Sequence, residues 1–398
     1  MNIFLNPELI EDVFCKSLAS NDDSSRHGVL IPVFAYHLFP SFSGYDPLER
    51  VNHGTDITTL WPQCNGEERH SSWKHYHRYP ERRMTRLDSG LLNGQTKGSL
   101  FVVGKYREEN IYECVVIEPS HPDYKLIGER FMLDMDSDSL FTGAAIIPYL
   151  EFSGEKEPDS SLDELVALYD EVNGLGFVKT MRNGDTGVGY TFESLIGIDA
   201  NSSKIPDFKG IEIKCSRSRR MKERRVSPGG KQTLFSLIPQ WGELEGRRGL
   251  IEAYGRPDDA KGRISIYCTI KIVENTYGWS LEIDDEEMVI HVCHEGKRIL
   301  YYDMRDLKSA LENKHGESVF ITAETRGVGE EEEFYYDSMV HCREVLFSEY
   351  IDMIKENLAG LDFAIHLKDG KVKDHGFLWR MDSKKYLLRL FRYVQEIR

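Results

Sequence analysis

The sequence of 398 residues has no apolar run long enough to span a bilayer, and its N-terminus lacks a basic stretch followed by an apolar segment. These absences argue against a helical membrane protein and a secreted one, so we expect a cytoplasmic protein with no membrane partner. The seven cysteines occur singly, without any CxxC spacing. This pattern argues against a disulfide framework and against a zinc site, and it predicts free, reduced thiols.

The sequence also lacks an excess of positive charge. Lysine and arginine number 50 against 66 aspartate and glutamate residues, for a formal net charge of -16. A nucleic-acid-binding protein usually carries a basic surface, so the distribution of charge matters more than the total here. Acidic residues gather in Glu151–Glu171, Asp284–Glu287 and Glu330–Glu333, which we interpret as solvated faces. The basic residues of the opposite pole are Lys214, Arg217, Arg219, Arg220, Lys222, Arg224, Arg225 and Lys231.

The length and a hydrophobic content of 40% are sufficient for two folded domains. After an amphipathic helix predicted over residues 1 to about 18, short apolar runs separated by Gly, Pro, Asn and Asp predict a β-rich region from Val29 to about Leu150. Residues 153–160 resemble a linker, and apolar spacing predicts a helix over Leu162–Val172. We therefore expect domains over residues 1–155 and 160–398.

The chemistry-bearing stretch is Tyr190–Arg217. Glu193 lies on an expected helix turn, Asp207 precedes a turn at Gly210, and the strand Ile211–Lys214 follows. Since strand side chains alternate between faces, Glu212 and Lys214 share one face, and a bend at Gly210 brings Asp207 towards them. Two carboxylates beside a lysine suit Mg²⁺-assisted phosphodiester hydrolysis. The plainer alternative is a surface strand with a Glu/Lys pair and an unrelated aspartate.

This stretch resembles the catalytic core of the MvaI/BcnI restriction endonucleases, which are related to the mismatch-repair nicking enzyme MutH and have the PD-(D/E)XK nuclease fold. The motifs that carry the resemblance are Thr186-Gly187-Val188-Gly189 with Glu193, Leu195-Ile196-Gly197-Ile198, Pro206-Asp207 and Gly210-Ile211-Glu212-Ile213-Lys214. The resemblance implies that Asp207 and Glu212 hold Mg²⁺. It also implies that Lys214 positions the attacking water and that Glu193 is an accessory carboxylate.

In the N-terminal region, aromatic rings alternate with cations over Trp73–Arg86, a mixture that suits a nucleic-acid surface but also a solvated loop. Pro80–Leu87 and Gly98–Val103 resemble the N-terminal effector domain of the EcoRII restriction enzyme. That resemblance implies a DNA-binding pseudobarrel that grips the major groove with two arms. We place the arms near His37 to Tyr45 and near Lys105 to Arg107, supported by Arg82, Arg83 and Arg86.

The remaining C-terminal pattern predicts mainly strands. We expect a basic loop over Ser216–Gln232 and helices over Asp337–Leu358 and Lys384–Ile397, with His341 in a structural role. The expected strands are Thr233–Pro239, Ile264–Val273 paired with Trp279–Ile283, and Met288–Val292 paired with Arg298–Tyr302 through a turn at Glu295-Gly296.

Near the C-terminus, Ala364–Leu367 and Val372–Arg380 predict a hairpin around Asp369-Gly370. Its Asp374, His375 and Arg380 resemble the part of the MvaI/BcnI family that reads bases, although Phe377-Leu378 departs from that family. Their donors and acceptors suit groove edges, whereas an ordinary hairpin is the alternative.

Taken with the two resemblances, these patterns predict a mixed fold: a β-rich DNA-binding pseudobarrel followed by an α/β PD-(D/E)XK nuclease domain. The resemblances imply a Mg²⁺-dependent, site-specific endonuclease for double-stranded DNA, with CC-(A/T)-GG as the favoured site and a monomer favoured over a homodimer. The pseudobarrel would engage a second copy of the site. The alternatives are a modification-dependent endonuclease and a DNA-binding regulator that does not cleave. The residues expected to contact the DNA backbone are Arg217, Arg219, Arg220, Arg224 and Arg225.

Overall fold

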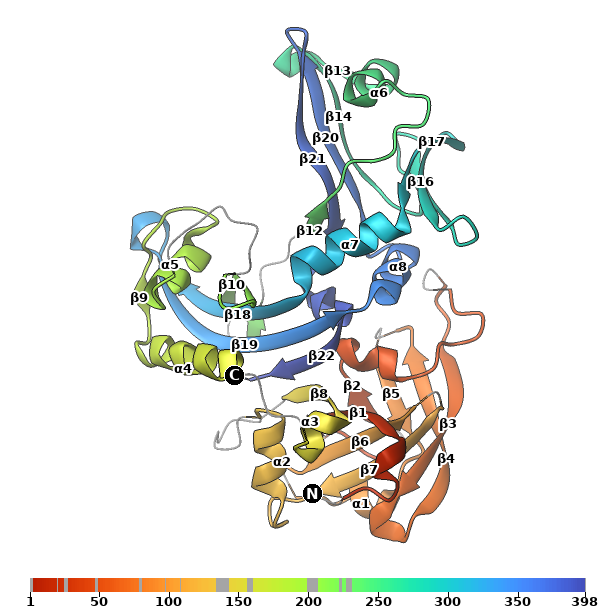
Figure 1. Ribbon diagram of the computed structural model, residues 1–398, viewed down its shortest axis with the longest axis vertical. Helices are drawn as coiled ribbons and strands as arrows, with labels where there is room; N and C mark the ends of the chain where they lie inside the picture. Colours follow the sequence, from red (N-terminus) through yellow and green to blue (C-terminus); the bar gives the residue numbers. More distant parts are fainter. Residues whose placement is uncertain are drawn as a thin grey trace.

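The computed structural model describes residues 3–19, 21–24, 28–46, 49–78, 81–96, 98–107, 109–133, 143–155, 160–198, 207–221, 224–226 and 231–397, without the side chains of 160, 219–221, 224–226, 384 and 385. The chain forms a β-rich N-terminal part, residues 3–155, and a mixed α/β C-terminal part, residues 160–397 (Figure 1). The fold class expected from the sequence is therefore confirmed. Among the described residues, no helix has the length and apolarity needed to cross a membrane.

The N-terminal part is a strongly bent antiparallel sheet with one parallel pair, β3 with β7. Its strands are β1 Ile10–Ser17, β2 Val29–Ile31, β3 His53–Trp61, β4 Glu67–Tyr76, β5 Glu81–Thr85, β6 Leu100–Tyr106, β7 Ile111–Ile117 and β8 Ala144–Pro148, in the order β8-β1-β6-β7-β3-β4-β5-β2. Its helices are the 3-10 helices η1 Pro7–Leu9, η2 Val33–Leu38 and η3 Pro62–Cys64, with α1 Ser89–Leu92, α2 Tyr124–Arg130 and α3 Tyr149–Ser153.

The helix expected near the N-terminus is wrong, because residues 10–17 form strand β1 between β6 and β8. Both faces of this strand are buried. Val13 and Cys15 pack in one apolar cluster, while Phe14 packs in another on the opposite face. A single apolar helix stripe cannot serve two cores, so pairing with two neighbouring strands determines the structure.

The sheet continues into the C-terminal part through β22 Phe391–Glu396, whose Gln395 pairs with Ala145 of β8. Beyond β22 lie β19 Glu333–Val345, β18 Glu317–Arg326, β10 Glu212–Met221 and β11 Arg224–Val226. Helices α4 Ser160–Gly174 and α5 Gly187–Leu195 cover this end of the sheet, and β9 Val178–Lys179 pairs with β19. Their shared core contains Leu165, Tyr169, Phe192, Ile213 and Val319. This small lobe carries the predicted catalytic residues.

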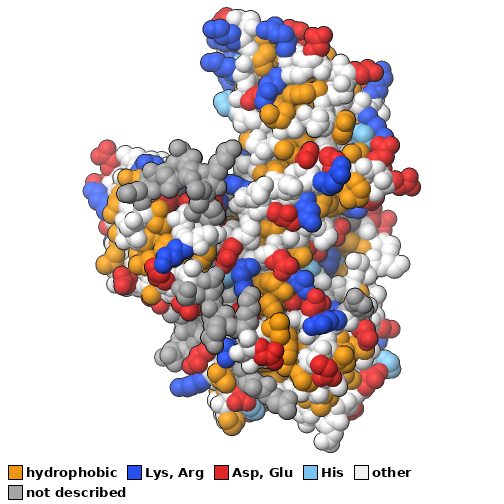
Figure 2. Space-filling model, viewed as in Figure 1, with side chains coloured by type: hydrophobic (Ala, Val, Ile, Leu, Met, Phe, Trp, Pro, Cys, Tyr) orange, Lys and Arg blue, Asp and Glu red, His pale blue; other side chains and the backbone are white. Residues whose placement is uncertain are grey.

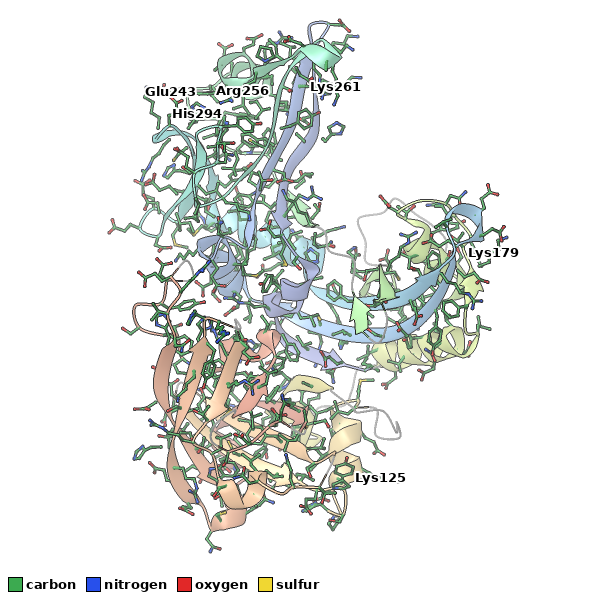
Figure 3. The ribbon with its side chains drawn as sticks, turned by 180° about the vertical axis from the view of Figure 1, so that it is seen from behind. Lys125, Lys179, Glu243, Arg256, Lys261 and His294 are labelled. Carbon is green, nitrogen blue, oxygen red and sulfur yellow. The ribbon has the colours of Figure 1, made fainter. Side chains whose placement is uncertain are left out.

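A second lobe stands above the sheet (Figure 1). It contains a five-stranded sheet of β12 Gln232–Ser236, β21 Lys371–Met381, β20 Ala359–Lys368, β14 Arg263–Ile270 and β13 Arg256–Asp258, in that order. A three-stranded sheet adds β15 Trp279–Asp284, β16 Val289–His294 and β17 Lys297–Asp303. The helices here are α6 Gly246–Tyr254, α7 Met304–His315, α8 Phe347–Lys355 and the 3-10 helices η4 Asp259–Lys261 and η6 Lys384–Leu390. The 3-10 helix η5 Gly329–Glu331 belongs to the small lobe instead, where it connects β18 to β19 and its Glu331 contacts Lys179 of β9. Seen from behind, Arg256 and Lys261 mark the far end of this lobe, remote from Lys179 on the small lobe (Figure 3).

Four further predictions about the C-terminal part are wrong. The helix predicted over 337–358 is strand β19 followed by the shorter α8, and the closing helix is η6 followed by strand β22. The predicted basic loop begins as the continuation of β10, which pairs with β11. Strand β14 pairs with β20, whereas β15 pairs with β16. For β19, β22 and β14 the deciding strand partner is distant in the sequence, and local periodicity does not contain it.

Candidate functional site

Two residues of left-handed backbone bring Asp207 beside strand β10. Lys209 has φ 44° and Gly210 has φ 98°. Phe208 and Ile211 exchange backbone hydrogen bonds of 2.9 and 2.7 Å across this turn, so the chain reverses direction at the predicted bend. The Asp207 Oδ2 atom then accepts a 2.9 Å hydrogen bond from the N–H of Ile213.

Strand β10 presents Glu212 and Lys214 side by side. Its parallel pairing with β18 sets Glu212 opposite Ser318 and Lys214 opposite Phe320. Ile211 and Ile213 are buried, while Lys214 donates a hydrogen bond from Nζ to Glu212 Oε1. The structure thus brings Asp207, Glu212 and Lys214 to one end of β10, as the alternation of side chains predicts.

Lys314, which was not predicted from the sequence, also reaches this group. It lies in the last turn of α7, with Nζ 3.5 Å from Glu212 Oε1. Burial alone would raise the pKa of Glu212, but bonds and charge from Lys214 and Lys314 outweigh burial and lower it. No local motif indicates Lys314, because it is about a hundred residues away in the chain.

Glu193 projects from α5 towards the same group. Gly189, one turn earlier on α5, leaves space here, since a Cβ at that position would meet Glu193 Oε1 at 3.4 Å. Burial raises the pKa of Glu193, and the nearby Asp207 charge adds to that rise against Lys214 and Arg182. Two neighbouring carboxyl groups, Glu193 and Glu212, therefore have pKa values moved in opposite directions, an arrangement typical of acid–base sites.

The carboxylates of this group suit Mg²⁺. A hard cation takes oxygen ligands, and Mg²⁺ is usually held by one or two carboxylates with water and substrate phosphate. Asp207 and Glu212 supply such oxygens on adjoining segments. Among the described residues, one group of three possible metal ligands has its ligand atoms within 4.8 Å of one another. That group is Asp284, Glu287 and His291, and it includes neither Asp207 nor Glu212. There Arg298 contacts Asp284 at 3.2 Å, which opposes a second cation.

Arg217, which was predicted to contact the DNA backbone, is held by groups of the protein itself. Its guanidinium donates to Glu332 at 2.8 and 2.9 Å and to the carbonyl oxygens of Gly184 and Asp185 at 2.7 and 2.8 Å. Arg217 therefore ties the segment before α5 to the segment before β19. The side chains of Arg219, Arg220, Arg224 and Arg225 lie outside the described residues, although their backbone forms the β10–β11 ladder.

The predicted base-reading residues lie on β21 but have separate partners. Asp374 accepts a hydrogen bond from Arg247 of α6, and its Oδ1 accepts one from the N–H of Gly376 at 3.2 Å. His375 and Tyr267 both line a hollow of about 600 Å³. The exposed Lys368, Lys371 and Lys373 extend along the same hairpin, where blue side chains gather at the end of the molecule (Figure 2).

Arg380 donates to Asp362 Oδ2 on the neighbouring strand β20 at 3.0 Å. Asp362 also accepts from Thr269 at 2.6 Å and from Lys231 at 3.0 Å. Three donors from three segments thus meet one carboxylate. Asp362 and Arg247 were not predicted as site residues, although Asp362 stands out as the single charge within the apolar run Leu358–Leu367.

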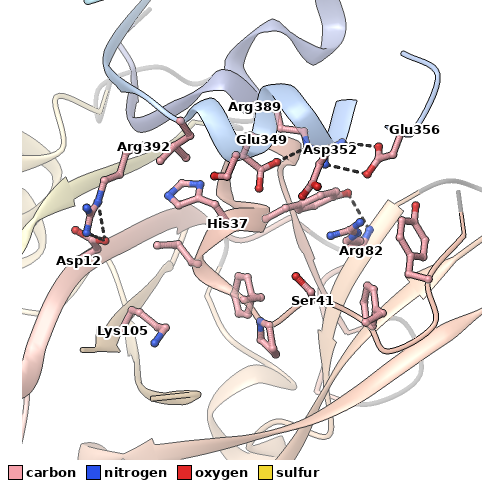
Figure 4. Close-up of a pocket in the computed structure, with 18 of the residues that line it drawn as sticks. Asp12, His37, Ser41, Arg82, Lys105, Glu349, Asp352, Glu356, Arg389 and Arg392 are labelled. Atoms are coloured by element: carbon pink, nitrogen blue, oxygen red, sulfur yellow. Dashed lines mark hydrogen bonds and ion pairs between the residues drawn. The ribbon is translucent and has the colours of Figure 1, made fainter. Parts of the chain in front are cut away.

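Four of the residues predicted for the N-terminal arms, His37, Tyr45, Arg82 and Lys105, line one hollow of about 560 Å³ (Figure 4). The Arg82 guanidinium lies 4.5 Å from the ring centroid of Tyr36 and 5.3 Å from that of Tyr45. Burial lowers the pKa of His37 to about 4, so its ring is neutral at pH 7.

The other predicted residues of this region lie elsewhere. Arg83 is buried against Glu81 at 2.9 Å, Arg86 is exposed and lies 3.6 Å from Asp56, and the exposed Arg107 donates its backbone N–H to Leu9.

Comparisons with known proteins indicate the family of the chain. The model of the MvaI/BcnI restriction endonuclease family matches residues 167–391, more than half of the chain. The chain is similar to the solved structure of the restriction endonuclease MvaI with cognate DNA (24% identity, 61% of this chain and 100% of that chain, TM-score 0.47). It is also similar to MvaI in the absence of DNA (24%, 60% and 99%, TM-score 0.39). A third similar structure is the UbaLAI restriction endonuclease B3 domain with cognate DNA (28%, 35% and 87%, TM-score 0.29). No curated protein matches the chain.

Proposed function

Because the chain belongs to the MvaI/BcnI restriction endonuclease family, we propose that residues 160–398 are a Mg²⁺-dependent nuclease domain and that Asp207, Glu212, Lys214 and Glu193 form its active site. The observation that carries the proposal is the meeting of Asp207, Glu212 and Lys214 at one end of β10. This donor set matches metal-assisted hydrolysis of a phosphodiester, in which the bound metal polarises the phosphoryl oxygen and activates water.

The protein groups have distinct roles in this proposal. Asp207 and Glu212 offer the carboxylate oxygens for Mg²⁺, and the Ile213 N–H orients Asp207. The Lys214 ammonium, positioned by Glu212, orients the attacking water or stabilises the negative charge that develops on the phosphate. Glu193, whose pKa is raised by burial, would hold a water beside the metal and is the carboxylate best suited to accept a proton.

DNA recognition is assigned to the larger lobe and to residues 1–155. Asp374, His375 and Arg380 read base edges, and Arg217, Arg219, Arg220, Arg224 and Arg225 contact the backbone. In the arms, His37, Tyr45, Lys105 and Arg107 contact DNA, supported by Arg82, Arg83 and Arg86. The proposed target is CC-(A/T)-GG in double-stranded DNA. A monomer would bind one copy at the nuclease and a second copy at the arms.

Cleavage of plasmid DNA tests the proposal. We expect discrete fragments with Mg²⁺, none with EDTA, and none with Lys214→Ala, whereas the control Lys297→Ala on β17 cleaves normally. Sequencing of the fragment ends identifies the site, and methylated substrate separates a restriction enzyme from a modification-dependent one. Cleavage by Lys214→Ala at the wild-type rate, or without any metal, would overturn the assigned chemistry.

A further inference from the structure

The arm residues of the N-terminal part face another part of the same chain. The wall opposite His37, Tyr45, Arg82 and Lys105 is formed by α8, η6 and the start of β22 (Figure 4). This wall is anchored at its edge, because Arg392 donates to Asp12 at 3.0 Å and to Glu11 at 2.6 Å. The surface proposed for DNA is therefore opposed by the nuclease half.

Helix α8 turns a stripe of carboxylates towards the arms. Glu349, Asp352 and Glu356 are spaced i, i+3 and i+7, so they lie on one side of the helix, while Tyr350, Met353 and Ile354 are buried on the other. Arg389 fixes two of the three, with Nε 2.5 Å from Glu349 and Nη1 2.5 Å from Glu356. Asp352 is exposed and completes the stripe.

The charges across the hollow are matched. Its lining has equal numbers of acidic and basic residues: Glu11, Asp12, Glu349, Asp352 and Glu356 against Arg82, Lys105, Lys355, Arg389 and Arg392. A duplex presents one negative charge about every 1.7 Å along its axis, and cations that bind it must first leave their protein partners. The carboxylates of α8 thus offer the arms the same kind of charge that a phosphate backbone would.

We propose that the acidic stripe of α8 occupies the place of a DNA phosphate backbone on the arm surface, so that a duplex binds the N-terminal part only by displacing α8. This inference rests on the proposed DNA-binding role of the arms. It also links the arms to base reading, because α8 leads directly into β20, the strand that carries Asp362 and thereby orients Arg380. A duplex on the arms would in this way affect the β20–β21 hairpin, which carries the proposed base-reading residues.

The test uses the full chain and a fluorescently labelled duplex containing CC-(A/T)-GG, with anisotropy measured in EDTA so that nothing is cut. Asp352→Lys removes one competing charge and adds a cation. We expect affinity to rise about three- to tenfold, as for a partly exposed charge pair. Asp306→Lys, the same change at an exposed site on α7, is the control and should raise affinity by less than about twofold. The Asp352→Lys gain should disappear when Arg82→Ala or Lys105→Ala is added.

Two different failures are distinguishable. If Arg82→Ala and Lys105→Ala leave affinity unchanged in both the wild-type and the Asp352→Lys backgrounds, the arms do not bind DNA and the proposed function of the N-terminal part fails. If these arm variants weaken binding but Asp352→Lys behaves like Asp306→Lys, the arms bind DNA and the displacement of α8 is overturned.

Discussion

Asp362 is expected to control how efficiently the enzyme recognises its site, although it has no proposed contact with DNA. Its carboxylate accepts hydrogen bonds from Thr269, Lys231 and Arg380 at 2.6, 3.0 and 3.0 Å. The Nε atom of Arg380 is buried without a partner among the described residues, so Asp362 is the group that fixes this guanidinium. Asp362→Asn keeps the size and the bond from Thr269 but removes the charge.

The magnitude follows from the bond that weakens. A hydrogen bond to a charged group contributes about 1.5–3 kcal/mol, which corresponds to about a 10- to 100-fold change in kcat/KM if Arg380 must be oriented to read a base. Burial would raise the pKa of Asp362, but its bonds from Thr269, Lys231 and Arg380 outweigh burial and lower the pKa. Since a lowered carboxylate pKa stabilises the fold only above the unfolded value of 3.8, this contribution is lost as the pH falls below that value.

The assay is steady-state cleavage of a duplex with one site, together with binding to a duplex that lacks the site. Asp362→Asn should lower kcat/KM on the site and leave non-specific binding unchanged. Asp258→Asn is the matched control, because Asp258 forms a similar 2.8 Å pair with Arg263 on a neighbouring strand. A folded Asp362→Asn protein with wild-type kcat/KM would refute the positioning role.

Three other outcomes are expected. Burial raises the pKa of Glu396 from 4.5 to about 7, so ionisation of this carboxyl lowers the stability of the fold by up to about 3 kcal/mol as the pH rises from 4.5 to 7. Glu396→Gln should therefore raise the Tm at pH 8 but not at pH 4. Equal Tm shifts at both pH values would contradict this. Lys314→Ala should slow single-turnover cleavage by less than about tenfold, since Lys214 still contacts Glu212; a loss as large as that of Lys214→Ala would make Lys314 an equal partner. Arg217→Ala should lower the free energy of unfolding in urea by about 1.5–3 kcal/mol, because four hydrogen bonds to protein oxygens are lost. Unchanged stability together with weaker DNA binding would instead indicate that Arg217 acts only as a contact to the DNA backbone.

The proposed catalytic group could be read from the sequence because its members are close together. Asp207, Gly210, Glu212 and Lys214 fall within eight residues, so a tight turn and strand alternation suffice to predict that they meet. The hairpins β16–β17 and β20–β21 were likewise predictable, as their turns are local.

Features that depend on distant partners could not be read in this way. Residues 333–345 have apolar spacing compatible with a helix, but pairing with β18 and β22 makes them a strand. Lys314 reaches Glu212 only because the fold brings together segments about 100 residues apart. Asp352 likewise faces Arg82 across a separation of about 270 residues. Single-sequence patterns contain no signal for such contacts.

The central claim is that Asp207 and Glu212 serve a metal in DNA cleavage. The most direct measurement is the single-turnover cleavage rate as a function of Mg²⁺ concentration for the wild type, Asp207→Asn, Glu212→Gln and the control Glu282→Gln. The two site variants should lose at least about 10³-fold in rate at every Mg²⁺ concentration, the equivalent of several kcal/mol. Their affinity for the duplex in EDTA should stay close to that of the wild type. Cleavage by Asp207→Asn or Glu212→Gln within tenfold of the control would contradict the assignment.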